Sequence, residues 1–90
     1  MMRLIGRDKL RRASADVNRW LRNWCAEVVH AYWRRPEDIT DQFPNACMRS
    51  DGDFLFPVGA SGYSVRVQIA FPQNIVLVLE MNKADILYGS

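Results

Sequence analysis

Residues 53–79 read DFLFPVGASGYSVRVQIAFPQNIVLVL, and this stretch decides the fold. Apolar and polar residues alternate from Tyr63 to Phe71, which is typical of a strand with one buried face and one solvated face. The same period of two runs from Asp53 to Val58, and a glycine-containing turn at 59–62 separates the two segments. The stretch therefore predicts antiparallel strands that are joined by tight turns.

Three further segments are candidate strands. Ile75–Leu79 is apolar on both faces, which favours a central strand covered on both sides. Met2–Ile5 and Ala46–Arg49 are shorter candidates, and a turn at 50–52 follows the second of them. Pro57 indicates that its strand lies near an edge of the sheet or ends there.

The first half of the chain predicts helices. Ser14 is a suitable N-cap, and from there to Trp33 the apolar residues recur with a helical period. The stripe expected to face the core consists of Val17, Trp20, Leu21, Trp24, Cys25, Val28, Ala31 and Tyr32. A second helix is expected from Pro36 to near Phe43, where Pro44 ends it, and a short one is expected over 7–13.

Helices followed by hairpin-linked strands predict the α+β class, with N-terminal helices packed on one face of a small antiparallel sheet. The chain has 90 residues, of which 49% are hydrophobic and 11% aromatic. That length supports one core and that composition is sufficient to close it, so residues 1–90 are expected to form a single domain.

Positive and negative charges are separated along the chain. Residues 1–35 contain nine basic and three acidic residues, a balance of +6, whereas residues 36–90 contain three basic and seven acidic residues, a balance of −4. A basic segment is expected of a protein that presents one face to phosphates or to an acidic protein, and it also serves solubility on a small helical surface. Both interpretations are open at this point.

Other classes of protein fit the sequence poorly. The longest apolar run, Ile75–Leu79, is far shorter than the roughly 20 residues of a membrane-spanning helix, and charges from Arg3 onward interrupt any signal-peptide core. Cys25 and Cys47 share no spacing typical of metal ligands, and His30 is the only histidine. We therefore expect a cytoplasmic protein with two reduced, mostly buried thiols, no metal and no other cofactor.

Several short motifs in a fixed order resemble one known family. They are Met2-Arg3-Leu4-Ile5, Trp24 with Ala26-Glu27-Val28, Trp33-Arg34-Arg35-Pro36-Glu37-Asp38-Ile39, Phe43-Pro44-Asn45-Ala46, and Gly52-Asp53-Phe54-Leu55-Phe56-Pro57-Val58-Gly59 followed by Tyr63. In this order they resemble the HigB toxins of type II toxin–antitoxin systems, which belong to the RelE/ParE superfamily. The resemblance covers nearly the whole chain, and it implies a compact α+β domain that cleaves mRNA at the ribosome and is silenced by a helix-turn-helix antitoxin.

The chain departs from the family pattern at several positions. Ser61 and Ser64 occupy the places where the family usually has asparagine at the hairpin tip and arginine after the tyrosine. Near the C-terminus, Lys83 takes the place of the family's histidine and Ile86 that of its tyrosine, and the arginine of the last strand is absent. The usual catalytic motif is therefore largely missing.

The resemblance implies roles for the cations that remain. Cleavage through attack by a 2′-hydroxyl needs a base, an acid and cations that stabilise charge on phosphorus. Arg66 and Lys83 are the candidate cations and Tyr63 is the third candidate catalytic residue, although Tyr63 also fits a core position and both cations also fit solvated positions. The candidate contacts to RNA phosphates or to a partner protein are Arg19, Arg22, Arg34 and Arg35.

An alternative function keeps the fold and loses the chemistry. A catalytically inactive, toxin-derived protein would use its charged surface to bind a macromolecule, as does a phage or mobile-element inhibitor of a host defence complex, for example an anti-CRISPR protein. Trp33 fits this interpretation, because on the helical wheel it lies toward the polar side beside arginines, where exposed aromatic residues anchor interfaces. The same residue also fits a helix end that folds back onto the core.

Overall fold

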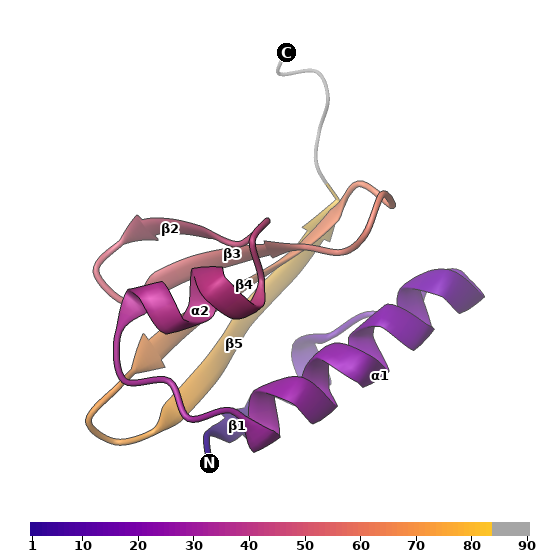
Figure 1. The fold of residues 1–90 in the computed structure, drawn as a ribbon. Helices are drawn as coiled ribbons and strands as arrows, with labels where there is room; N and C mark the ends of the chain where they lie inside the picture. Colours follow the sequence, from indigo (N-terminus) through magenta and orange to yellow (C-terminus); the bar gives the residue numbers. More distant parts are fainter. Residues whose placement is uncertain (84–90) are drawn as a thin grey trace.

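The computed structural model describes residues 1–83, which form one sheet and two α-helices (Figure 1). In chain order the elements are β1 (Arg3–Ile5), the 3₁₀ turn η1 (Arg7–Lys9), α1 (Ala15–His30), α2 (Pro36–Gln42), β2 (Cys47–Ser50), β3 (Asp53–Pro57), β4 (Tyr63–Ala70) and β5 (Ile75–Lys83). The α+β class and the predicted strands of 53–79 are confirmed. Ile86, which the motif comparison invoked, lies outside the described residues.

The sheet has the strand order β1-β5-β4-β3-β2. Neighbours from β2 to β5 are antiparallel, as the tight turns between them require. β1 instead runs parallel to β5, with Leu4 opposite Val76, so the sheet is mixed and the prediction of a wholly antiparallel sheet is wrong. No turn joins β1 to β5, and therefore no local signal in the sequence sets the direction of β1.

α1 begins where the sequence predicts. The Oγ atom of Ser14 accepts a hydrogen bond of 3.2 Å from the backbone N–H of Val17, which satisfies a free donor of the first turn. Trp24 packs edge-on against Phe56 of β3, with ring centroids 5.3 Å apart. The residues of α1 that are buried against the sheet are Val17, Leu21, Trp24 and Val28.

α1 ends at His30, before the predicted end at Trp33. Ala31 has an extended backbone, and its carbonyl accepts a hydrogen bond of 3.1 Å from the N–H of Met2. Successive side chains of extended backbone point to opposite sides, so Tyr32 is 71% exposed while Trp33 is only 2% exposed. The predicted core position of Tyr32 is therefore wrong, and so is the position of Trp33 on the polar side.

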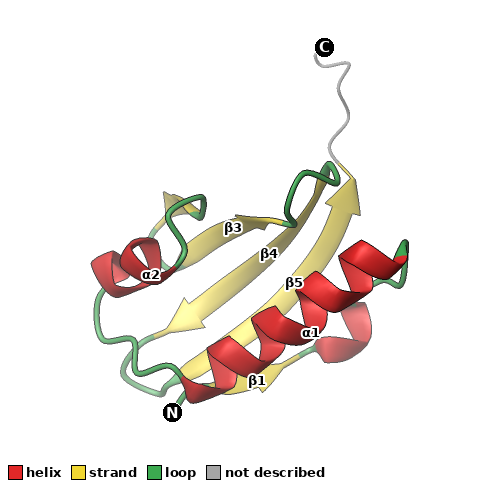
Figure 2. Cartoon of the chain, turned by 45° about the vertical axis from the view of Figure 1, so that its right-hand side comes forward, coloured by secondary structure: helices red, strands yellow, loops and turns green. Residues whose placement is uncertain are grey.

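Both helices cover the same face of the sheet (Figure 2). The strand residues buried beneath them are Phe54, Phe56, Val65, Val67, Ile69, Val76, Val78 and Met81. The opposite face, which we call the open face, is covered by no element of residues 1–83, and Leu77 on it is 36% exposed. The prediction that β5 is covered on both sides is therefore wrong, because both helices lie on one side.

The helix predicted over residues 7–13 is reduced to the single turn η1. After it, the backbone N–H of Arg11 donates to Met81 Sδ at 3.2 Å, and that of Ala13 donates to Asn18 Oδ1 at 3.0 Å. These donors are engaged by β5 and α1 and not by carbonyls of a preceding turn. Tertiary contacts therefore override the helix propensity of the segment.

Candidate functional site

The open face carries a hollow of about 200 Å³ beside the end of β5. Its lining residues come from four strands and are Arg49, Leu55, Ser64, Arg66, Glu80, Asn82 and Lys83. Three of these residues are cations and one is a carboxylate. The hollow therefore suits an anionic ligand that also carries a hydroxyl group able to donate a proton to the carboxylate. We call this hollow the open-face site.

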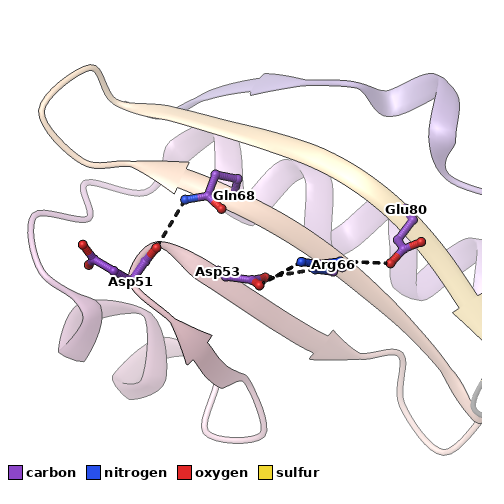
Figure 3. A network of polar contacts seen from close by, with 5 residues as sticks. All are labelled: Asp51, Asp53, Arg66, Gln68 and Glu80. Carbon is purple, nitrogen blue, oxygen red and sulfur yellow. Dashed lines mark hydrogen bonds and ion pairs between the residues drawn. The ribbon is translucent and has the colours of Figure 1, made fainter.

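Arg66 lies at the centre of the open-face site, between two carboxylates (Figure 3). Its Nε and Nη2 atoms donate to the two oxygens of Asp53 at 3.2 and 3.0 Å. Its Nη1 atom donates to Glu80 Oε2 at 3.4 Å from the other side. Two parallel bonds to one carboxylate fix the plane of a guanidinium, so Asp53 orients Arg66 while Glu80 holds it more loosely.

The charges around Arg66 stabilise one another. Hydrogen bonds from Arg66 hold the pKa of Asp53 below its ordinary value, and the bond to Asp53 followed by that to Glu80 raises the pKa of Arg66. Asp53 is only 7% exposed, a position in which an unpaired carboxylate is unfavourable. Arg66 therefore stays protonated and oriented, and its charge is offset by two acids.

An irregularity in β5 brings Glu80 to the open face. Arg66 pairs with Glu80 and Val67 pairs with Val78, so Leu79 is an extra residue in β5. Strict alternation from the buried Val78 would turn Glu80 toward the helices, but the bulge at Leu79 shifts the phase by one residue. The acid of the open-face site is thus placed there by this bulge.

Tyr63 and Lys83 form a pair apart from Arg66. They are opposite each other on β4 and β5, and Lys83 Nζ lies 5.8 Å from the centroid of the Tyr63 ring. Tyr63 is two residues before the buried Val65 and therefore lies on the same face of β4. Tyr63 and its cross-strand partner Lys83 thus both leave the sheet on the face that packs against the helices. Lys83 also lines the end of the open-face site, but its side chain and that of Arg66 leave the sheet on opposite faces.

The four arginines expected to contact RNA fall into two pairs. Arg19 and Arg22 are exposed on α1, where Arg19 makes a long contact of 3.9 Å with Asp16. Arg34 and Arg35 lie beyond the opposite end of the helix, and Arg35 is 3.9 Å from Asp38. The two pairs of arginines therefore lie at different places along the chain, one on α1 and one between α1 and α2.

Trp33 is part of the core. Its ring stacks on Phe56 with centroids 6.4 Å apart, and its Nε1 donates to Gln42 Oε1 at 3.0 Å. Gln42 in turn donates to Glu27 at 3.2 Å, so these contacts tie α2 to α1. The interpretation of Trp33 as an exposed interface residue is wrong, and the alternative in which it folds back onto the core is confirmed.

Within residues 1–83, no three side chains of His, Cys, Asp or Glu lie close enough together to hold a metal ion.

Cys25 is half-buried, and this burial raises the pKa of its thiol although Arg7 opposes the shift. Cys47 is exposed, against prediction, because β2 is an edge strand whose four residues all face solvent. Neither α-helix of this part of the chain is long and apolar enough to cross a membrane.

The alternation of β4 identifies Arg66 from the sequence, but no pattern singles out Asp53, Glu80 or Arg49. The period of two in β3 places the side chains of Asp53 and the buried Phe54 on opposite faces of the strand. This is the one signal in the sequence that assigns Asp53 to the polar face. For Glu80 the signal is misleading, because the bulge reverses the alternation just before it. The neighbours of Arg66 therefore become visible only when the strands are paired.

The open-face site brings together groups that suit a phosphodiester. Arg66 and Arg49 supply cationic N–H donors, and the carboxylate of Glu80 beside Arg66 can accept a proton. Ser64 and Asn82 add neutral hydrogen-bonding groups at the rim. The arrangement can hold a phosphate group and deprotonate a hydroxyl next to it.

Comparison with known proteins assigns no family. No family model matches the chain, and no curated protein matches it.

Proposed function

We propose that this protein is a HigB-type toxin of the RelE/ParE superfamily, an endoribonuclease that cleaves mRNA at the ribosome and is neutralised by a helix-turn-helix antitoxin. The observation that carries the proposal is the contact of 3.4 Å between Arg66 and Glu80 inside a hollow on the open face. A cation for the phosphate and a carboxylate for the proton are what cleavage through a 2′-hydroxyl requires. The motifs that resemble the family support the same function.

In the proposed reaction Glu80 accepts the proton of the 2′-hydroxyl, and the 2′-oxygen forms a bond to the adjacent phosphorus. The bond between phosphorus and the 5′-oxygen breaks, and the leaving oxygen takes up a proton from water. The products are a 2′,3′-cyclic phosphate and a 5′-hydroxyl. Arg66 donates hydrogen bonds to the phosphorane oxygens, while Asp53 holds the guanidinium in place from behind.

Lys83 and Arg49 have supporting roles in this proposal. Arg49 lines the open-face site from β2 together with Arg66, and Lys83 lines its end from β5, although the Lys83 side chain leaves the sheet on the other face. Tyr63 holds Lys83 through the contact between its ring and the ammonium group. These residues act on the position of the RNA, and Glu80 and Arg66 act on the reacting atoms.

A second candidate function is a catalytically inactive, toxin-derived protein that binds a macromolecular partner such as a host defence complex. The double hydrogen bond from Arg66 to Asp53 favours it, because this bond occupies one side of the guanidinium and leaves fewer donors for a phosphate. In that case Asp53, Arg66 and Glu80 stabilise the sheet, and only the charged surface of the protein is used.

Expression from an inducible promoter without an antitoxin distinguishes the two functions. We expect the wild-type protein to arrest growth and to leave cleaved transcripts with 5′-hydroxyl ends, and we expect Glu80→Gln to abolish both effects. Glu37→Gln is the matched control, because it makes the same chemical change at an exposed position of α2. Healthy cells with intact wild-type transcripts would refute the nuclease and leave the binding protein as the function.

A further inference from the structure

A second hollow, of about 370 Å³, lies between the segment that follows η1 and one flank of α1. Its lining residues are Leu10, Arg11, Arg12, Asn18, Leu21, Arg22 and Cys25. We call it the basic hollow. None of these residues lines the open-face site, and α1 packs on the other face of the sheet, so the two hollows are separate.

Residues 1–83 provide no acidic partner for the three arginines of the basic hollow. Among residues 1–83, no carboxylate lies within ion-pair distance of Arg11, Arg12 or Arg22, and no acidic residue lines the hollow. A concave surface lined by charges of one sign concentrates the electrostatic field and attracts counter-ions. The basic hollow therefore has the electrostatics of an anion-binding site.

The wall of the basic hollow is held in place without a ligand. The backbone N–H of Arg11 donates to Met81 Sδ of β5 at 3.2 Å, and the N–H of Ala13 donates to Asn18 Oδ1 of α1 at 3.0 Å. The segment is thus fixed at two points on either side of Arg12. A preformed backbone lowers the entropy lost on binding, because only the arginine side chains have to be ordered.

We propose that the basic hollow binds the phosphate groups of a single RNA strand, at a place distinct from the open-face site. Guanidinium groups form paired hydrogen bonds with phosphate oxygens, and the apolar floor at Leu10 and Leu21 accommodates the sugar face. The sequence indicates Arg22 as a candidate contact to RNA phosphates, and Arg11 and Arg12 lie beside it in the basic hollow. The inference depends on the proposed function only for the choice of RNA as the polymer.

Binding of a short single-stranded RNA with 2′-O-methyl sugars tests the proposal, since this probe cannot be cleaved through its 2′-oxygen. We expect Arg12→Ala and Arg22→Ala each to lower the affinity about tenfold and to reduce the slope of log affinity against log salt by about 0.7. Arg3→Ala is the matched control, because it removes one exposed charge on β1, away from both hollows. We expect it to change the affinity by less than about twofold.

Two results would overturn the proposal. The first is an affinity loss in Arg12→Ala and Arg22→Ala no larger than in Arg3→Ala, with all three variants melting like the wild type. The second is tighter binding of a polyglutamate peptide than of the RNA probe, with the preference for the peptide lost in Arg22→Ala. The basic hollow would then bind an acidic protein. Failure of the proposed function is distinguishable, since a wild-type protein that binds the probe and cleaves no transcript would contradict only the nuclease.

Discussion

The open-face site and the basic hollow both present arginine to solvent, but they treat its charge in opposite ways. Arg66 is held between Asp53 and Glu80 by three hydrogen bonds. The arginines of the basic hollow have no acidic partner within residues 1–83. A guanidinium that carboxylates hold in place can orient a reacting phosphate, whereas a guanidinium without an acidic partner attracts phosphates more strongly. The comparison therefore assigns RNA cleavage to the open-face site and RNA affinity to the basic hollow.

The two regions depend on one core. Trp24 of α1 packs against Phe56 of β3, so the helix that forms a wall of the basic hollow is attached to the sheet that carries Arg66. Substitutions in this core are expected to remove both activities together. Substitutions in either hollow are expected to separate them.

Trp24→Ala should have the largest effect. Trp24 is 1% exposed, and its removal leaves a cavity beside Phe56, so we expect the free energy of unfolding to fall by about 3–5 kcal/mol. Chemical denaturation measures this loss. Tyr32→Ala is the control at a 71% exposed aromatic, with an expected change within about 0.5 kcal/mol. Equal stability of the two variants would refute the assignment of the core face of α1.

Glu80→Gln should come next and should act on only one side of the comparison. Loss of the proposed base is expected to slow RNA cleavage by about 10²–10⁴-fold, while binding of the 2′-O-methyl probe is retained. Cleavage rates with excess protein over RNA measure the effect without a contribution from affinity. A rate within a few-fold of the wild type would show that Glu80 does not take the proton.

Asp53→Asn tests the comparison by making the open-face site more like the basic hollow. The amide cannot pair with Arg66 as a carboxylate does, so one offsetting charge is lost and the guanidinium is less firmly oriented. We expect cleavage to slow while the salt dependence of RNA binding becomes steeper by about 0.7 in slope. An unchanged slope together with normal cleavage would contradict a positioning role for Asp53.

The smallest expected effect is a dependence on pH. The pKa of Asp53 is lowered by its bond to Arg66, so the stability that this pair adds is present above the ordinary pKa of aspartate and is lost as the pH falls through the folded value. The difference in stability between the wild type and Asp53→Asn should therefore be constant near neutral pH and should shrink below about pH 4. Urea unfolding of both proteins across this range measures it. A difference that grows toward acid would contradict the assigned pair.

Local patterns in the sequence predicted most of the elements. The cap at Ser14, the proline at the start of α2 and the alternation of β4 are local signals, and the corresponding elements form as expected. The direction of β1 and the position of Trp33 were not predictable, because each depends on contacts with distant segments. Met2 pairs with Ala31, and this pairing ends α1 early and turns Trp33 inward.

The sequence predicted the candidate site at Arg66 and, through the family resemblance, at Lys83, but not at the carboxylates that hold Arg66. Its two carboxylates come from neighbouring strands, and their approach depends on strand order and on the bulge at Leu79, neither of which alternation reports. The basic hollow was predictable only at Arg22. Arg11 and Arg12 were expected on a helix, and they line the hollow because tertiary hydrogen bonds keep that segment extended along α1 and β5.

The most direct test of the division between the two regions is the salt dependence of binding to the 2′-O-methyl RNA probe, measured for the wild type, Arg66→Ala and Arg22→Ala. Each variant loses one positive charge, and the slopes are compared once Arg66→Ala is shown to melt like the wild type, because that substitution also leaves the buried Asp53 without its partner. We predict that Arg22→Ala reduces the slope by about 0.7 and that Arg66→Ala reduces it by less, because two carboxylates already offset the charge of Arg66. A slope that falls more in Arg66→Ala than in Arg22→Ala would contradict the account.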